Sequence, residues 1–244
     1  MSKYDIDLDY AMPKIDISKE ELNEIIAEAD SIIAENSVSP DKLAVAYLKK
    51  GQCLYKLAQA KEFAQAKDSF DMEKLYEVKE LLEKALKLKA DMPEVLMRLG
   101  SIYSEISEYE RSYLDELRMR DANDEIVVSI SVRKELGLPI TREEFEKLPL
   151  FDYLFNEAVA MLTKAIQLKP DYAAAFNNRS NVFHNMYMNH QENLKKAISD
   201  LTEAIRIRPF DATYYYSRGQ RYSEVGEHEK AFVDFSSAIN YGSD

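Results

Sequence analysis

Glycine and cysteine are both scarce in this chain of 244 residues. Six glycines are few for a β-rich fold, because sheets are joined by many tight turns. Alanine, leucine, glutamate and lysine dominate instead, which favours helices. A single cysteine, Cys53, excludes an intramolecular disulfide and a cysteine-clustered metal site. Because Cys53 lies in an apolar helical stretch, we expect a packed side chain rather than a nucleophile, in an all-α protein.

Long apolar runs are also missing. The sequence has no run of roughly 18 apolar residues that could span a membrane. Its first sixteen residues, MSKYDIDLDYAMPKID, lack the apolar core of a signal peptide. We therefore expect a cytoplasmic protein that does not bind membranes.

Basic residues are outnumbered, with 32 Lys and Arg against 44 Asp and Glu, which gives a net charge of −12. The segment from Ala173 to Asp244 carries eight basic and nine acidic residues, so −11 of the charge lies in the first 172 residues. A field of this sign repels phosphate backbones. Nucleic acid is therefore not an expected partner. The simplest explanation of the negative net charge is that it keeps the protein soluble.

Catalytic motifs are absent from the sequence. It contains no glycine-rich phosphate loop, no HExxH motif and no nucleophile elbow. Two of its three histidines, His184 and His190, are six residues apart, which places them on opposite sides of a continuous helix. We predict no catalytic residues, no metal and no cofactor, although an enzyme site within residues 107–153 is the alternative.

Internal repeats are the strongest signal in the sequence. Four segments that begin a helix place a large apolar residue four positions before a small residue and another three positions after it. The small residues are Gly51, Gly100, Ser180 and Gly219. Four further segments end a helix alike, and these are LLEKALKLKAD (81–91), MLTKAIQLKPD (161–171), DLTEAIRIRPFD (200–211) and DFSSAINYGSD (234–244). A small residue allows the second helix of each pair to approach the first closely.

This pattern resembles the tetratricopeptide repeat (TPR), a pair of antiparallel helices about 34 residues long. The last repeat matches the signature spacing of the family at Tyr215, Gly219, Tyr222, Gly226, Ala231, Phe235 and Ala238. The resemblance implies a TPR-like helical-hairpin solenoid, wound as a right-handed superhelix, with about four repeats at residues 44–91, 93–171, 173–211 and 212–244. Large apolar residues then fill the space between successive pairs, since one pair cannot bury its apolar face alone.

The repeats carry insertions, because their small residues are 49, 80 and 39 positions apart (51 to 100, 100 to 180 and 180 to 219). The second repeat holds either a long insertion or a degenerate helix pair within residues 107–153. In that segment residues 126–132 alternate enough for a strand, and Thr141 begins a capping-box motif. We expect elongated helices to absorb most of the added residues.

A helix is predicted ahead of the repeats. Ser18 and Glu21 form a capping-box motif at the start of an amphipathic stretch that continues to about Asn36. Ser39 and Pro40 then supply an N-cap and a first helical residue for the first repeat. We therefore divide the chain into an N-terminal extension with a packing helix (1–38) and a TPR domain (39–244).

The sequence after the fourth repeat contains no polar capping helix, which solenoids normally need for solubility. The last predicted helix carries Phe232, Ile239 and Tyr241, and self-association through these residues is one way to cover it. A possible homo-oligomer through the C-terminal repeat is therefore part of the prediction.

In the TPR fold the first helices of successive repeats line a concave groove that commonly holds peptides or protein segments. The resemblance puts groove positions two, three and six residues before each small residue, and one, four and five after it. From these positions we predict a binding site at Lys49, Arg98, Asn177, Asn178, Asn181, His184, Asn185, Tyr216 and Gln220.

Asparagine is unusually frequent between residues 176 and 193. At about 100° per residue, one helical arc contains Asn177, Asn178, Asn181, His184 and Asn185, whereas Asn189 and Asn193 fall beyond it and are predicted to lie in a turn or at the start of the next helix. An amide both donates and accepts hydrogen bonds, so it can pair with the backbone of an extended peptide. The alternative is a polar face that is merely solvated.

TPR domains that clamp the acidic tails of heat-shock chaperones provide a further comparison. Asn178 fits one role in that clamp, but Met97 and Ser101 stand where lysine and asparagine are expected, and Thr213 and Ser217 where lysine and arginine are expected. We therefore do not predict tail binding. The predicted function is a non-catalytic scaffold or adaptor that binds a peptide or protein in the groove. The alternative is a structural subunit that assembles through its C-terminal helix and residues 107–153.

Overall fold

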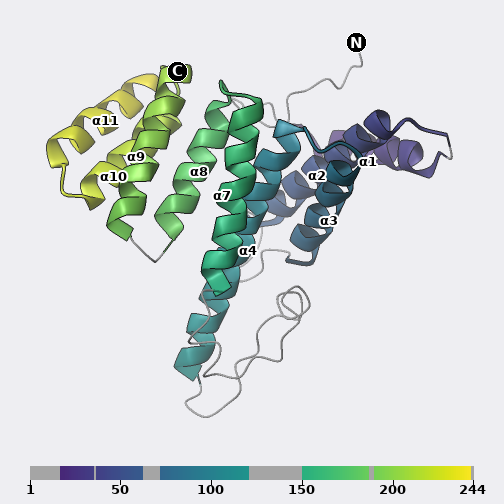
Figure 1. The fold of residues 1–244 in the computed structure, drawn as a ribbon, viewed down its shortest axis with the longest axis horizontal. Helices are drawn as coiled ribbons and strands as arrows, with labels where there is room; N and C mark the ends of the chain where they lie inside the picture. Colours follow the sequence, from purple (N-terminus) through teal and green to yellow (C-terminus); the bar gives the residue numbers. More distant parts are fainter. Residues whose placement is uncertain (1–16, 36, 63–71, 121–149, 187–189, 243–244) are drawn as a thin grey trace. The chain divides into compact units, whose positions relative to one another are not determined.

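The computed structural model describes residues 17–35, 37–62, 72–120, 150–186 and 190–242, and every regular element in these ranges is an α-helix (Figure 1). The helices are α1 (Lys19–Ala34), α2 (Pro40–Glu62), α3 (Met72–Leu88), α4 (Pro93–Arg120), α7 (Leu150–Leu168), α8 (Ala173–Asn185), α9 (His190–Ile207), α10 (Ala212–Glu224) and α11 (His228–Tyr241). The prediction of an all-α fold is confirmed.

The chain divides into two compact units. Unit 1 comprises Met1–Ile102 and Met161–Ala175, and unit 2 comprises Tyr103–Ala160 and Phe176–Asp244. The division falls inside helices α4, α7 and α8. The predicted separation of residues 1–38 from 39–244 stays a prediction.

In unit 1, the N-terminal helix α1 packs against α2 as predicted. Its start is the expected capping box: Ser18 Oγ accepts from the Glu21 N–H at 3.1 Å, and the Ser18 N–H donates to Glu21 Oε2 at 2.9 Å. Leu22 and Ile25 of α1 form a buried cluster with Cys53 of α2. Burial raises the pKa of the Cys53 thiol to about 11, which agrees with a packed, unreactive residue.

Helix α3 packs closely on α2 at a glycine. A methyl group at Gly51 would lie 3.3 Å from Leu82 Cδ2 and 3.6 Å from Val78 Cγ1 of α3. Both α3 residues are fully buried, so the small residue brings the apolar face of α3 against α2. Gly51 therefore has the role that the repeat pattern predicts.

Unit 2 contains two helix pairs that are joined by similar ion pairs. Between α8 and α9, Arg179 donates to both carboxylate oxygens of Asp200, at 2.8 and 2.7 Å. Between α10 and α11, Arg218 donates to both oxygens of Asp234, each at 2.8 Å. Both aspartates are buried, so each pair joins its two helices inside the protein.

The predicted insertions are partly helical. Helix α4 continues to Arg120 and α7 begins at Leu150, which places both ends of the inserted segment in helices, and α2 extends to Glu62. The possible strand at 126–132 and the capping-box motif at Thr141 lie outside the described residues. In the third repeat, α8 ends at Asn185 and α9 begins at His190.

We predict that Gly219→Ala lowers the free energy of unfolding. The new methyl group would lie 2.8 and 2.9 Å from two ring carbons of Phe235 and 3.3 Å from the carbonyl oxygen of Ala231. Overpacking of this kind costs about 1–3 kcal/mol, which exceeds the gain of about 1 kcal/mol from replacing a helical glycine. Urea denaturation followed by circular dichroism measures the difference. Gly51→Ala is the matched control. Its methyl group would lie 3.3 Å from Leu82 Cδ2 and 3.6 Å from Val78 Cγ1, which are both side-chain atoms at less severe distances. A more stable Gly219→Ala variant would contradict the predicted close packing.

Candidate peptide-binding site

The predicted site residues are distributed over both units. Lys49 on α2 and Arg98 on α4 belong to unit 1. Unit 2 contains the others, which are Asn177, Asn178, Asn181, His184 and Asn185 on α8 and Tyr216 and Gln220 on α10. The unit 2 residues therefore form the larger candidate site, and a single groove through all nine residues stays a prediction.

In unit 1, the guanidinium of Arg98 stacks over an aromatic ring. Its Cζ lies 4.7 Å from the ring centroid of Tyr55 on α2, within the range of a cation–π contact. Lys49 is half-buried on α2, and its positive charge, like that of Lys56, opposes the burial that raises the pKa of Cys53. Lys49 and Arg98 lie on α2 and α4, the first helices of two successive predicted repeats, and their place in a groove stays a prediction.

Helix α8 has one buried side and one amide side. Ser180 and Val182 are almost completely buried, whereas Asn177, Asn178 and Asn181 are half-buried. The amide nitrogen of Asn177 donates to Asn178 Oδ1 at 3.4 Å, while Asn177 Oδ1 is buried with no hydrogen-bond donor among the described residues. The amide face thus contains an acceptor whose hydrogen-bonding capacity is unused.

On α10, Tyr216 and Gln220 occupy positions equivalent to those of Asn177 and Asn181. The Tyr216 side chain is 54% exposed, and its ring centroid lies 5.7 Å from that of Phe235 on α11. Gln220 is half-buried. An exposed aromatic ring followed by an amide one turn later adds a stacking surface and a further hydrogen-bonding group to the candidate site.

A chain of polar contacts joins α4, α8 and α10 within unit 2. On α4, Ser104 Oγ donates to Glu108 Oε1 at 3.2 Å. The amide nitrogen of Asn185, on α8, donates to the same Glu108 oxygen. Asn185 Oδ1 lies 2.9 Å from His184 Nδ1. Adjacent first helices are therefore connected by side chains.

The same chain continues from α8 to α10. His184 Nε2 lies 3.1 Å from Glu224 Oε2, and Arg221 Nη1 donates to Glu224 Oε1 at 2.9 Å. Burial lowers the pKa of the His184 imidazole below its ordinary value, and the charge of Arg221 lowers it further, whereas Glu224 and Asn185 act in the opposite direction. The imidazole is therefore neutral near pH 7, and it links the last turns of two first helices.

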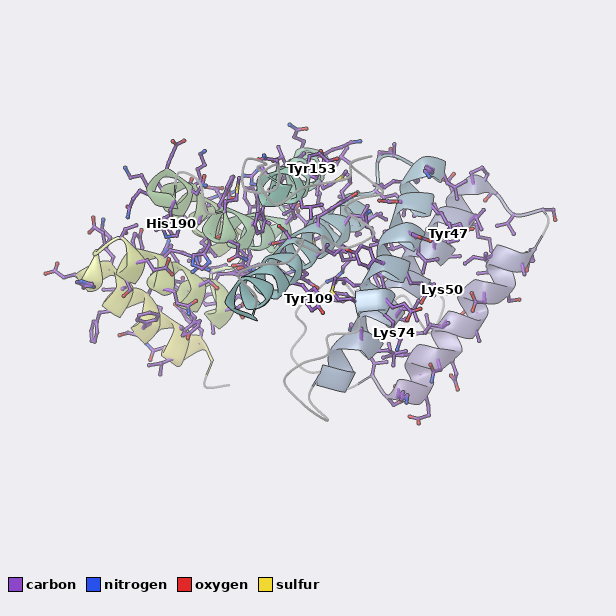
Figure 2. The ribbon with its side chains drawn as sticks, turned by 90° about the horizontal axis from the view of Figure 1, so that it is seen from below. Tyr47, Lys50, Lys74, Tyr109, Tyr153 and His190 are labelled. Carbon is purple, nitrogen blue, oxygen red and sulfur yellow. The ribbon has the colours of Figure 1, made fainter. Side chains whose placement is uncertain are left out.

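The expectation that His184 and His190 lie on opposite sides applies only to a continuous helix, which the chain does not form here. Helix α8 ends at Asn185 and α9 begins at His190, so the two histidines are not on one continuous helix. Their ring centroids lie 6.3 Å apart, and Figure 2 marks His190 on its helix. Asn193 lies near the start of α9, as predicted, whereas Asn189 falls outside the described residues. Among the described residues, no group of three or more His, Cys, Asp and Glu side chains could hold a metal ion.

Sequence reasoning missed two members of this polar chain, Glu108 and Arg221. Glu108 lies eight residues after Gly100, outside the groove positions that the resemblance implies. Its distance of four residues from Ser104, and that of three residues between Arg221 and Glu224, are the spacings at which helical side chains meet. These spacings could have indicated the two contacts within single helices. The contact of Glu108 with Asn185 joins residues 77 positions apart, so no spacing in the sequence indicates it.

None of the helices in the described part of the chain has the length and apolar character needed to cross a membrane. No protein-family model matches the sequence, and no curated protein matches it.

Solved structures provide the comparison instead. The MamA RS-1 ArsTM double mutant matches with a TM-score of 0.56 at 12% identity, over 92% of this chain and 86% of that chain. A crystal structure of MamA matches with a TM-score of 0.53 at 17% identity, over 92% and 90%. TTC0263, a thermophilic TPR protein in Thermus thermophilus, matches with a TM-score of 0.54 at 14% identity, over 91% and 84%.

MamA and TTC0263 are both TPR proteins. Their similarity covers nearly the whole chain, and the helix pairs follow the repeats of the sequence. This protein therefore has a TPR-like fold.

Proposed function

We propose that this protein is a non-catalytic scaffold or adaptor of the cytoplasm that binds an extended peptide or protein segment through its first helices. The observation that carries the proposal is the amide face of α8, where Asn177, Asn178 and Asn181 remain partly exposed while the opposite side is buried. Asparagine is a poor helix former, so three asparagines within five residues lower the stability of the helix. Lysine or glutamate at the same positions would avoid this loss.

An extended segment presents alternating N–H and C=O groups, and amide side chains can pair with both. Tyr216 and Gln220 lie at the equivalent positions of α10, and the contact between His184 and Glu224 shows that α8 and α10 lie side by side. The face therefore offers hydrogen-bonding groups on two adjacent helices, together with one exposed ring. The net charge of −12 supports a protein partner over a nucleic acid.

Self-association through α11 is a second candidate function, and it is favoured by exposed apolar residues. Phe232 is 73% exposed and Ile239 is 71% exposed. The equivalent residues of α9 are Ile198, which is half-buried, and Ile205, which is 9% exposed, and α10 packs against that helix. A second copy of this chain, meeting α11 with its own α11, would give Phe232 and Ile239 the cover that α10 gives to α9.

Substitution of two asparagines tests the amide face. Asn178→Ala/Asn181→Ala should weaken the binding of peptides selected from a random display library on the wild-type chain by about tenfold or more. Loss of two amide hydrogen bonds, at about 0.5–1.5 kcal/mol each, gives this magnitude. Isothermal titration calorimetry measures it, and Asn23→Ala, an exposed asparagine of α1, is the matched control. Unchanged affinity in the double variant would exclude the amide face as the binding site of those peptides.

The mass of the protein in solution tests self-association through α11. Light scattering coupled to size exclusion should give a mass above that of a monomer for the wild-type chain at high concentration. Phe232→Glu/Ile239→Glu should restore the monomer mass, because a buried charge without a partner opposes association. Val45→Glu, at an apolar position on α2 that is 41% exposed, should leave the mass of the wild-type assembly unchanged. A wild-type chain that stays monomeric throughout would rule out this assembly.

A further inference from the structure

The outer face of α11 repeats a three-residue pattern that α1 and α9 also carry. In each helix a large apolar residue is followed four positions later by a polar residue, and three positions after that by an isoleucine. Spacings of four and three place all members of a set on one side of a helix. The three sets are Ile26, Asp30 and Ile33 on α1, Ile198, Thr202 and Ile205 on α9, and Phe232, Ser236 and Ile239 on α11.

On α9 and on α1, the helix that packs against this face brings a cation to its polar residue. Helix α10 packs on α9, and Arg218 Nη1 donates to Thr202 Oγ1 at 3.2 Å. Helix α2 packs on α1, and Lys50 Nζ lies 2.7 Å from Asp30 Oδ1. Each cation directly precedes the glycine of its repeat. Two interfaces of this protein therefore combine the same kind of face with the same kind of helix.

The hydroxyl of Ser236 is held as that of Thr202 is held. Thr202 Oγ1 donates to the carbonyl oxygen of Ile198 at 2.8 Å, and it accepts from Arg218 at the same time. Ser236 Oγ likewise donates to the carbonyl oxygen of Phe232 at 2.8 Å. A hydroxyl group that donates can still accept, because it has two lone pairs. Ser236 therefore presents an acceptor at the position where α9 receives the arginine.

The α11 face is more exposed than its counterpart on α9, and it is nearly uncharged. Phe232 and Ile239 are 73% and 71% exposed, whereas Ile205 is 9% exposed. Residues 231–241 contain one charged side chain, Asp234, which is buried in an ion pair. The net charge of −12 favours a basic segment over a second acidic copy. The face is therefore suited to an apolar helix that carries a cation.

We propose that the α11 face, formed by Phe232, Ser236 and Ile239, binds an amphipathic helix of a partner protein with a lysine or arginine within its apolar side. The apolar residues of that helix cover Phe232 and Ile239, and its cation donates to Ser236. The inference does not depend on the amide face of α8. It deepens the second candidate function, because a partner helix and a second copy compete for the same surface.

The test uses the full chain and a stapled, fluorescein-labelled copy of α10, residues 212–225. The staple joins the positions of Tyr216 and Gln220, which lie on the opposite side of the helix from Arg218. Fluorescence anisotropy should show saturable binding. Arg218→Gln in the probe should lower the affinity by about tenfold, through loss of a hydrogen bond from a charged group. Thr213→Glu in the probe, the same change of charge at an exposed position, is the matched control.

Variants of the protein locate the binding surface. Ser236→Lys should weaken binding of the probe by about tenfold or more, because two like charges then meet. Ser237→Lys is the matched control, since its hydroxyl makes the same kind of bond, to the carbonyl oxygen of Val233 at 3.0 Å, but lies about 100° further round the helix. Phe232→Ala is a second variant, which should also weaken binding through loss of apolar contact. Circular dichroism confirms that each variant is folded.

Three results would each overturn the proposal: no saturable binding of the probe, unchanged binding in both folded variants Ser236→Lys and Phe232→Ala, or an Arg218→Gln probe that binds as tightly as the original. Light scattering coupled to size exclusion separates these results from self-association. If the probe binds and the free chain stays monomeric, the inference stands and self-association fails. If the chain associates through α11 and the probe does not release the monomer, the inference fails.

The amide-face variant separates the inference from peptide binding along α8. Asn178→Ala/Asn181→Ala should bind the helical probe as the wild type does, because both substitutions lie on α8. A loss of probe binding in this variant would place the probe at the amide face and would contradict docking on α11.

Discussion

The close approach of the two helices in each pair is the constraint on which the remainder of unit 2 depends. Gly219 allows the ring of Phe235 to lie against α10. The adjacent Arg218 donates to the two carboxylate oxygens of Asp234 through Nε and Nη2. A buried carboxylate is costly without such a partner, and a buried ion pair adds little net stability but penalises other arrangements strongly. The ion pair therefore acts chiefly to fix how α11 lies on α10. This register in turn determines which side of α10 faces solvent with Tyr216 and Gln220.

The same kind of arginine–aspartate ion pair joins helix pairs of different length. Arg179 and Asp200 are 21 residues apart, whereas Arg218 and Asp234 are 16 apart. Of the five extra residues, one lies between α8 and α9 and four lie at the start of α9. Burial raises the pKa of Asp200 above its ordinary value although Arg179 opposes the shift, which shows how strongly that carboxylate is desolvated. Lys50 occupies the equivalent position before Gly51, and it pairs instead with Asp30 of α1 at 2.7 Å. In unit 1, the residue at this position therefore forms an ion pair with the preceding helix α1, not with the second helix of its own pair.

The sequence was sufficient for what depends on neighbouring residues and on the repeat. The capping box at Ser18 and the close packing at Gly51 follow from spacings of a few residues, and both are present. The proximity of the His184 and His190 rings, whose centroids lie 6.3 Å apart, could not be predicted, because it depends on how α9 packs beside α8. The contact between Glu108 and Asn185 could not be predicted, since it depends on how α4 and α8 lie side by side. The amide face was predictable as a pattern, but its contacts were not.

The single cysteine can be used to measure local opening of the contact between α1 and α2. Cys53 is fully buried in the cluster that α1 and α2 form, and its raised pKa of about 11 keeps it protonated in the folded state. Thiol reagents attack the thiolate, so they can label this side chain only after the cluster has opened and water has reached it. The rate of labelling therefore measures how often α1 separates from α2, which is a local opening free energy of unit 1 that needs no introduced probe.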